Sequence, residues 1–161
     1  MKKGDKKPVI TICSSSSFYK QANDLQEELE KMGYEVLVPN MATAMKLENN
    51  YERKFYQPWL DDPTQYDVKA DLMRGHFDKV AKADAVLIIN GEKNGQKNYI
   101  GGNVLMEMGL AFHLGLPIYI FYDVPEESKL MEEIRGMLPI LMKGDVQKFP
   151  APEKIGSKAG A

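Results

Sequence analysis

Two short apolar runs, Asp84-Ala-Val-Leu-Ile-Ile89 and Pro117-Ile-Tyr-Ile-Phe-Tyr122, decide the fold, and a stretch with helical spacing at 103–114 separates them. Both runs are too short for helices and are rich in β-branched or aromatic residues, which is typical of buried strands. A strand, a helix and a second strand in this order predict a parallel pair joined by a crossover helix.

The same alternation begins the chain. Pro8-Val-Ile-Thr-Ile-Cys13 is another apolar run, residues 18–32 have helical spacing, and Tyr34-Glu-Val-Leu-Val38 forms a further strand candidate. Continuous apolar strands that alternate with helices indicate a parallel sheet covered on both faces. We therefore predict an α/β fold, a Rossmann-like three-layer sandwich with a four- to five-stranded parallel sheet, in which 138–142 would supply the fifth strand.

The length of 161 residues fits one domain. We expect a single Rossmann-like domain over 1–143, with an insertion at about 41–66 whose aromatic residues and prolines favour short helices or an ordered loop. The segment 144–161 has few apolar residues and is expected to be a flexible tail.

Composition excludes several classes of function. The net charge of −2 gives no basic field for nucleic acid or an anionic membrane, and no apolar run is long enough to span a bilayer. The charged N-terminus, 1–7, precedes an apolar run too short for a secretory signal, so we expect a cytoplasmic protein. One cysteine and two histidines favour neither a disulfide framework nor a metal site, and no cofactor is expected.

Ligands bind beyond the carboxyl ends of the strands in an open parallel sheet. Segments 14–18, 90–103 and 122–126 fall there, and they supply the candidate contacts to a small-molecule substrate. These candidates are Ser14, Ser15, Ser16, Phe18, Asn90, Asn98, Gly101, Gly102 and Asn103. Hydroxyls at a helix N-terminus suit an anion such as a phosphate, but serines and asparagines in these places also serve as caps and turn residues.

Glu107 is the most informative residue, because it lies in a helix that is apolar nearly all round and is therefore expected to be mostly buried. A carboxylate is costly to bury without partners, although the N-terminal end of a helix favours it. Gly101-Gly102 would allow a close approach of backbone or ligand, and Asn103 is a reasonable N-cap. From the pattern alone, Glu107 is either a functional carboxylate or a satisfied structural one.

The block Asp84-Ala-Val-Leu-Ile-Ile-Asn90, followed by Tyr99-Ile-Gly-Gly-Asn-Val-Leu-Met-Glu-Met-Gly-Leu-Ala-Phe-His-Leu-Gly-Leu-Pro117, resembles the nucleoside 2-deoxyribosyltransferase superfamily. That superfamily includes the deoxynucleoside 5′-monophosphate N-glycosidases. The resemblance implies that Glu107 is a nucleophile that attacks the anomeric carbon, expels the base and forms a glycosyl ester. It also implies a homo-oligomer.

Two positions depart from the family pattern. His76 stands eight residues before Asp84, where members usually carry an acidic residue, and Gly101 stands six before Glu107, where many transferases carry one. His76 could handle the proton instead, since its ordinary pKa suits that role, or the nearby Asp78 could stand in.

The expected function is cleavage or transfer at the N-glycosidic bond of a nucleoside or nucleoside 5′-monophosphate, with Glu107 and His76 as the catalytic residues. The alternative is a non-catalytic nucleotide-binding or sensing module of the same fold, which the missing acidic residues favour. A phosphoribohydrolase motif fits less well, because no Gly-Thr pair follows the glycines.

Overall fold

A computed structural model describes residues 6–155, so the predicted features of residues 1–5 and 156–161 lie outside the described part. Five parallel strands form one sheet in the order β2-β1-β3-β4-β5. They are β1 (Val9–Ser14), β2 (Glu35–Leu37), β3 (Ala85–Ile89), β4 (Ile118–Ile120) and β5 (Ile140–Leu141). The predicted α/β, Rossmann-like fold with a parallel sheet is confirmed.

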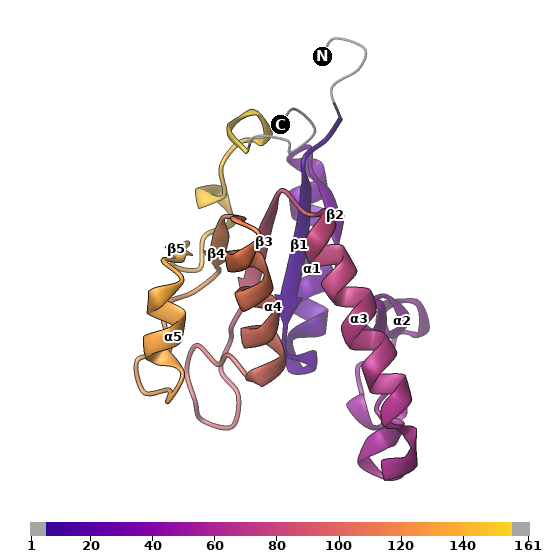
Figure 1. Ribbon diagram of the computed structural model, residues 1–161. Helices are drawn as coiled ribbons and strands as arrows, with labels where there is room; N and C mark the ends of the chain where they lie inside the picture. Colours follow the sequence, from indigo (N-terminus) through magenta and orange to yellow (C-terminus); the bar gives the residue numbers. More distant parts are fainter. Residues whose placement is uncertain (1–5, 156–161) are drawn as a thin grey trace.

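Helices cover both faces of this sheet, which makes three layers (Figure 1). The helix α1 (Tyr19–Lys31) packs on one face, and α3 (Tyr66–Lys82), α4 (Gly102–His113) and α5 (Met131–Gly136) pack on the other. The alternation of side chains along β1 explains the two cores, since Ile10 and Ile12 point toward α1 while Cys13 joins the opposite core.

Asp84 links the start of β3 to the start of β1 through two hydrogen bonds to Val9. Its backbone N–H donates to the carbonyl of Val9 at 2.7 Å, and its carboxylate accepts the N–H of Val9 at 2.8 Å. A carboxylate at this place therefore sets the register of the two central strands, on which the site is built.

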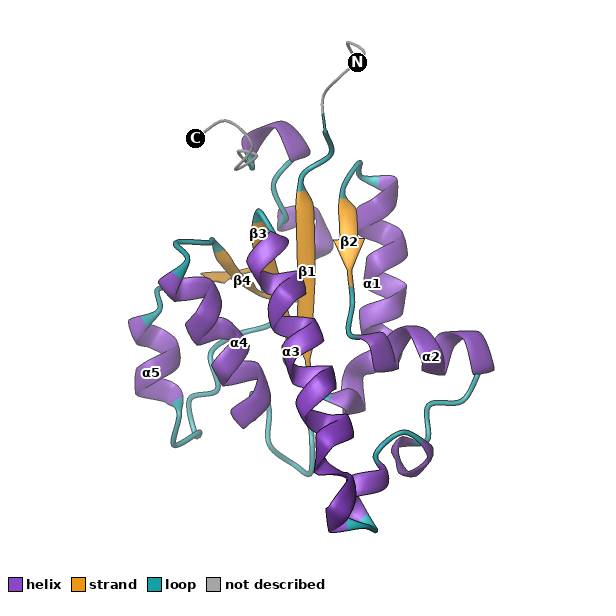
Figure 2. Ribbon diagram, turned by 45° about the vertical axis from the view of Figure 1, so that its right-hand side comes forward, coloured by secondary structure: helices purple, strands orange, loops and turns teal. Residues whose placement is uncertain are grey.

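Between β2 and α3 the chain forms α2 (Asn40–Glu48) and three short 3-10 helices, η2 (Arg53–Phe55), η3 (Pro58–Leu60) and η4 (Pro63–Gln65). Met41, Met45 and Trp59 form a small core of their own there. Together with the N-terminal end of α3, this segment extends past the carboxyl end of β1 (Figure 2). It thus stands beside the edge of the sheet where ligands are expected.

The C-terminal segment 144–155 is not the flexible tail that its composition predicts. Phe149 is only 2% exposed, and its ring packs against Tyr34 and Tyr119 at centroid distances of 5.3 and 4.6 Å. Ile155 is also buried in the α1-side core. The prediction is wrong here because Phe149, which lies between two tyrosines, and the buried Ile155 anchor a segment that is otherwise polar.

The other short helices of the described chain are η1 (Ser16–Phe18), which precedes α1, and η5 (Val146–Lys148) and η6 (Pro152–Lys154) in the C-terminal segment.

The helix α4 is less buried than its composition predicts, since Met106 and Phe112 are 45% and 53% exposed. Its apolar residues exceed what one buried face can hold, so some of them face outward. No helix among residues 6–155 has both the length and the apolar character needed to cross a membrane.

Candidate active site

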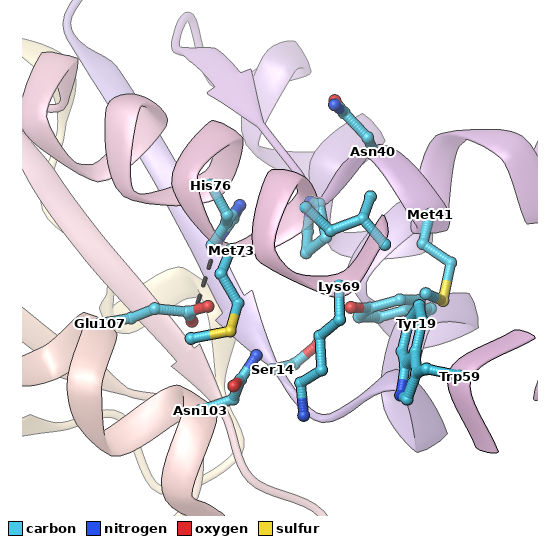
Figure 3. Close-up of a pocket in the computed structure, with 12 residues that line it drawn as sticks. Ser14, Tyr19, Asn40, Met41, Trp59, Lys69, Met73, His76, Asn103 and Glu107 are labelled. Atoms are coloured by element: carbon cyan, nitrogen blue, oxygen red, sulfur yellow. Dashed lines mark ion pairs between the residues drawn. The ribbon is translucent and has the colours of Figure 1, made fainter. Parts of the chain in front are cut away.

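A cavity of about 70 Å³ lies at the carboxyl end of β1, between α3, α4 and the segment that holds α2 and η3 (Figure 3). Its walls combine charged, polar and apolar side chains. They are Ser14, Tyr19, Pro39, Asn40, Met41, Trp59, Lys69, Leu72, Met73, His76, Asn103 and Glu107. The structure therefore brings together four of the residues that the sequence singles out, namely Ser14, His76, Asn103 and Glu107.

Glu107 reaches the cavity from the second turn of α4 and is 6% exposed. Among the described residues its Oε2 atom has no hydrogen-bond partner. Burial raises the pKa of this carboxyl to about 8, although a contact with the Cys13 thiol lowers it slightly. Glu107 therefore holds its proton at neutral pH, which costs less than burying the charge.

His76 faces Glu107 from α3, with 3.8 Å between its Nε2 atom and Oε2 of the carboxyl group (Figure 3). Its ring is 5% exposed, and burial, followed by the charge of Lys79, lowers its pKa to about 4. The imidazole is consequently neutral at pH 7. At pH 7 the pair is therefore uncharged, with a protonated carboxyl group on Glu107 and a neutral imidazole on His76.

Cys13 is the third member of this buried group, and it was not among the residues predicted for the site. Its sulfur, a His76 nitrogen and a Glu107 oxygen all lie within 4.8 Å of one another. Burial and the neighbouring Glu107 raise the pKa of the thiol well above its ordinary value. Its place near the end of an apolar strand was the one sequence signal that could have indicated a site residue. That signal does not reveal its neighbours, which come from α3 and α4 and lie far away in sequence.

Ser14 and Lys69 bring polar groups to the same cavity from β1 and α3. The hydroxyl of Ser14 is buried and has no hydrogen-bond partner among the described residues. Lys69 is half-buried and forms no ion pair within residues 6–155. Figure 3 shows its amino group on the side of the cavity where Ser14 and Asn103 lie. This corner can take an anionic or polyhydroxylated group.

Aromatic side chains form the opposite wall. Tyr19 and Trp59 line the cavity beside Met41, and Trp59 is buried in the small core of the α2 segment. Burial raises the pKa of the Tyr19 hydroxyl, so this group stays protonated at neutral pH. A flat wall of this kind suits stacking with an aromatic base.

The rest of the serine run points elsewhere. Ser15 caps η1 and accepts a hydrogen bond from the amine of Lys93 at 3.2 Å, and Ser16 accepts one from Gln57 at 3.2 Å. Phe18 packs against Gly91, where a Cβ atom would lie 3.0 Å from its ring. None of these three predicted contacts, Ser15, Ser16 or Phe18, is part of the cavity wall.

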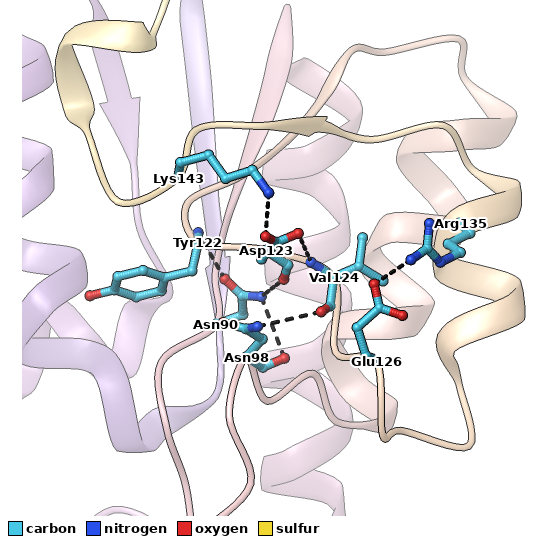
Figure 4. Close-up of polar contacts among 8 residues, drawn as sticks. All are labelled: Asn90, Asn98, Tyr122, Asp123, Val124, Glu126, Arg135 and Lys143. Atoms are coloured by element: carbon cyan, nitrogen blue, oxygen red, sulfur yellow. Dashed lines mark hydrogen bonds and ion pairs between the residues drawn. The ribbon is translucent and has the colours of Figure 1, made fainter.

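Asn90 and Asn98 brace the loop that follows β3 (Figure 4). The Asn90 amide donates to the carbonyl of Asp123 at 2.7 Å and accepts from the N–H of Tyr122 at 3.2 Å. Asn98 has a positive φ of 54° and donates to the carbonyl of Val124 at 3.4 Å. Their side chains thus join two loops, and the structure does not bring them to the cavity that Glu107 lines.

The N-terminus of α4 differs in detail from the sequence prediction. Gly101 is the N-cap, and Asn103 lies inside the first turn with its side chain at the cavity. A Cβ atom at Gly101 would lie 2.8 Å from the hydroxyl of Tyr99, so any larger residue there requires the Tyr99 side chain to move. Gly102 is exposed and does not line the cavity, and Asp78, the alternative acid, is exposed on α3.

Solved structures resemble this fold. One is a 2-deoxyribosyltransferase from the psychrotolerant bacterium Bacillus psychrosaccharolyticus, with a TM-score of 0.50 and 16% identity over 83% of this chain and 97% of that chain. Another is a CMP N-glycosidase of Clostridium botulinum, with a TM-score of 0.47 and 17% identity over 84% of this chain and 88% of that chain.

The chain has the fold of the 2-deoxyribosyltransferase. The predicted resemblance to the nucleoside 2-deoxyribosyltransferase superfamily is thereby confirmed at the level of the fold. No family model and no curated protein matches the sequence. What the chain does must therefore be argued from its own cavity.

Proposed function

We propose that this protein cleaves or transfers at the N-glycosidic bond of a nucleoside or nucleoside 5′-monophosphate. The supporting observation is the buried carboxyl group of Glu107, placed against His76 in the wall of a cavity at the carboxyl end of the sheet. In this proposal Glu107 attacks the anomeric carbon, and the base leaves with the electron pair of the broken C–N bond. Water or a second base then opens the glycosyl ester, which gives hydrolysis or transfer.

The attack requires the ionised form of Glu107, whereas burial favours the acid form. Positive charge that develops on the sugar favours the carboxylate, as in retaining glycosidases. His76 is the group in position to accept the proton, since its neutral ring lies 3.8 Å away. A shift of about 1 Å on substrate binding would bring these atoms within hydrogen-bond distance. His76 would thus replace the acidic residue that the family usually carries.

The aromatic wall would take the base. Tyr19 and Trp59 offer flat faces, and the cavity is smaller than the ~300–1,000 Å³ typical of small-molecule sites. We therefore expect the segment from α2 to η3 to move outward when a base enters, as a lid would.

The test is a chromatographic assay of free base, run on a panel of nucleosides and 5′-monophosphates with and without an acceptor base. Release without acceptor would indicate a hydrolase, and new nucleoside formed only with acceptor would indicate a transferase. Glu107→Gln, which keeps the shape of the side chain, should reduce turnover by roughly three orders of magnitude or more. Glu132→Gln, on the exposed side of α5, is the matched control and should be fully active. Wild-type turnover by Glu107→Gln would rule out the nucleophile.

Lys69 should distinguish monophosphates from nucleosides. Its amine lines the cavity beside Ser14 without an ion pair among the described residues, and charge-assisted hydrogen bonds to a phosphate are strong. We expect Lys69→Met to lower kcat/KM for monophosphates about 10- to 100-fold and to leave nucleosides unchanged. Arg74→Met is the control, because Arg74 lies on the same helix but is exposed and pairs with Asp71 at 3.7 Å. Equal losses on both substrate types would exclude a phosphate contact.

A non-catalytic nucleotide-binding module is the second candidate. It is favoured by the proton that Glu107 holds at neutral pH and by His76 and Gly101 at positions where the family pattern has acids. In that case no member of the panel would release base, while calorimetry would detect binding of a nucleotide.

A further inference from the structure

Three side chains with metal-ligating atoms converge behind the cavity, one from each of three elements. Cys13 comes from β1, His76 from α3 and Glu107 from α4, and their sulfur, nitrogen and oxygen atoms lie within 4.8 Å of one another. All three residues are buried. Since β1, α3 and α4 also form one packed core, this geometry is held by the fold rather than by a loop.

Three polar atoms of this group lack ordinary partners, although the Cys13 thiol contacts the carboxyl group of Glu107. Within the described residues, these atoms are the two imidazole nitrogens of His76 and the Oε2 atom of Glu107, none of which makes a hydrogen bond of normal geometry. Buried polar groups nearly always have such partners, so a cluster without them needs an explanation. A bound metal ion that accepts an electron pair from each of the three side chains would explain why these atoms have no hydrogen-bond partners.

We propose that Cys13, His76 and Glu107 form a binding site for a thiophilic divalent cation such as Zn²⁺. One thiolate, one imidazole and one carboxylate are all ordinary zinc ligands. Ligand atoms of a tetrahedral zinc site lie about 3.3–3.8 Å apart, given the usual metal–ligand bond lengths. A nitrogen and an oxygen ligand lie at the short end of this range, so the Nε2–Oε2 distance of 3.8 Å would shorten by about 0.4 Å on binding. The remaining ligand atoms lie within 4.8 Å of one another and would also move closer through small side-chain movements. His76 and Glu107 both line the cavity, so a fourth ligand could reach the ion from there.

The charges balance on binding. The thiol of Cys13 and the carboxyl group of Glu107 each lose a proton to solvent, and His76 binds through a neutral ring. Two negative ligands then offset the two positive charges of the ion, so that the buried site is neutral after binding. Sulfur in the ligand set favours zinc and other thiophilic ions over Mg²⁺ or Ca²⁺, which prefer oxygen.

Occupancy by the ion would block the chemistry proposed above, and this part of the inference rests on the proposed function. The oxygen of Glu107 that donates to the metal cannot attack a sugar carbon. The ion would therefore act as a reversible inhibitor, because it competes with the sugar carbon of the substrate for the carboxylate of Glu107.

The test uses the full chain, reduced with a non-thiol reductant and freed of metal by chelation. Co²⁺ should produce a thiolate-to-cobalt charge-transfer band together with intense four-coordinate ligand-field bands. Zn²⁺, titrated against a chromophoric chelator, should bind one ion per chain and remove these bands. Cys13→Ser should abolish the charge-transfer band, and both Cys13→Ser and His76→Gln should weaken Zn²⁺ binding by roughly 100-fold or more.

His113→Gln is the matched control, since His113 is the other histidine of the chain and is exposed at the end of α4. Far-UV circular dichroism establishes that each variant is folded, and either folded variant alone tests the site. Absence of the charge-transfer band in the wild-type chain, or equal Zn²⁺ affinity in wild type and in the folded variants, would overturn the proposal.

Binding and inhibition separate this inference from the proposed function. Zn²⁺ bound by the three residues in a chain that releases no base would support the site and count against the enzyme. Base release that Zn²⁺ leaves unaffected, in a chain without the cobalt signal, would support the enzyme and overturn the site. Inhibition relieved by a chelator, together with the cobalt signal, would support both.

Discussion

Glu107 is buried as an acid beside a histidine buried as a base, and burial is the leading cause of both shifted pKa values. The carboxyl pKa of about 8 and the imidazole pKa of about 4 lie in the reverse of their ordinary order. A titratable pair shifted in this way at a cavity is a common mark of a functional site. It also has a consequence for stability that can be measured without a substrate.

The direction in which stability changes with pH follows from the linkage between proton binding and folding. Because the folded pKa of Glu107 is raised to about 8, its contribution to stability is fully present below the unfolded pKa and is lost as pH rises through the folded pKa. Between pH 6 and pH 8 we expect the free energy of unfolding of the wild type to fall by about 2 kcal/mol relative to that of Glu107→Gln, which has no such proton. Urea unfolding of both chains at the two pH values measures this difference.

His76 acts in the opposite direction over the lower part of that range, since its folded pKa is lowered to about 4 and its contribution is lost as pH falls. The comparison with Glu107→Gln removes this effect because both chains retain His76. If the difference in free energy of unfolding between wild type and Glu107→Gln were the same at both pH values, Glu107 would be ionised in the folded protein.

At the level of the elements, the sequence predicted the strands well and the site contacts in part. The run 84–89 became Ala85–Ile89, and the expected fifth strand near 138–142 is Ile140–Leu141. These predictions hold because continuous apolar runs in a buried parallel sheet are a local signal. Glu107 was found for a similar reason, since a lone charge in an apolar helix stands out in the sequence.

The remaining contacts depend on which elements pack together, and no local pattern reports this. Asn90 was an expected substrate contact, but its amide joins the loops after β3 and β4 because those loops lie side by side. Cys13 was missed because its neighbours come from α3 and α4, far along the chain. Lys69 lies at the cavity because the α2 segment covers that end of α3, and its own sequence neighbourhood does not indicate this.

At the scale of the whole molecule, the C-terminal segment closes the α1-side core. Phe149 fills the space between Tyr34 and Tyr119, and the hydroxyl of Tyr34 donates a hydrogen bond to the carbonyl of Pro150. Ile155 extends the same core by one more buried side chain. The sheet face opposite the candidate site is therefore completed by residues that lie after the last strand.

Phe149→Ala should then behave as a large-to-small core substitution and lower the free energy of unfolding by about 3 kcal/mol or more. Lys148→Ala, at the exposed neighbouring position, should change it by less than about 0.5 kcal/mol. Urea unfolding at one pH measures both. Because the cavity lies on the other face and at the other end of β1, the folded Phe149→Ala chain should keep the substrate preference and the Zn²⁺ affinity of the wild type. A Phe149→Ala chain as stable as the wild type would mean that 144–155 contributes little to the core in solution.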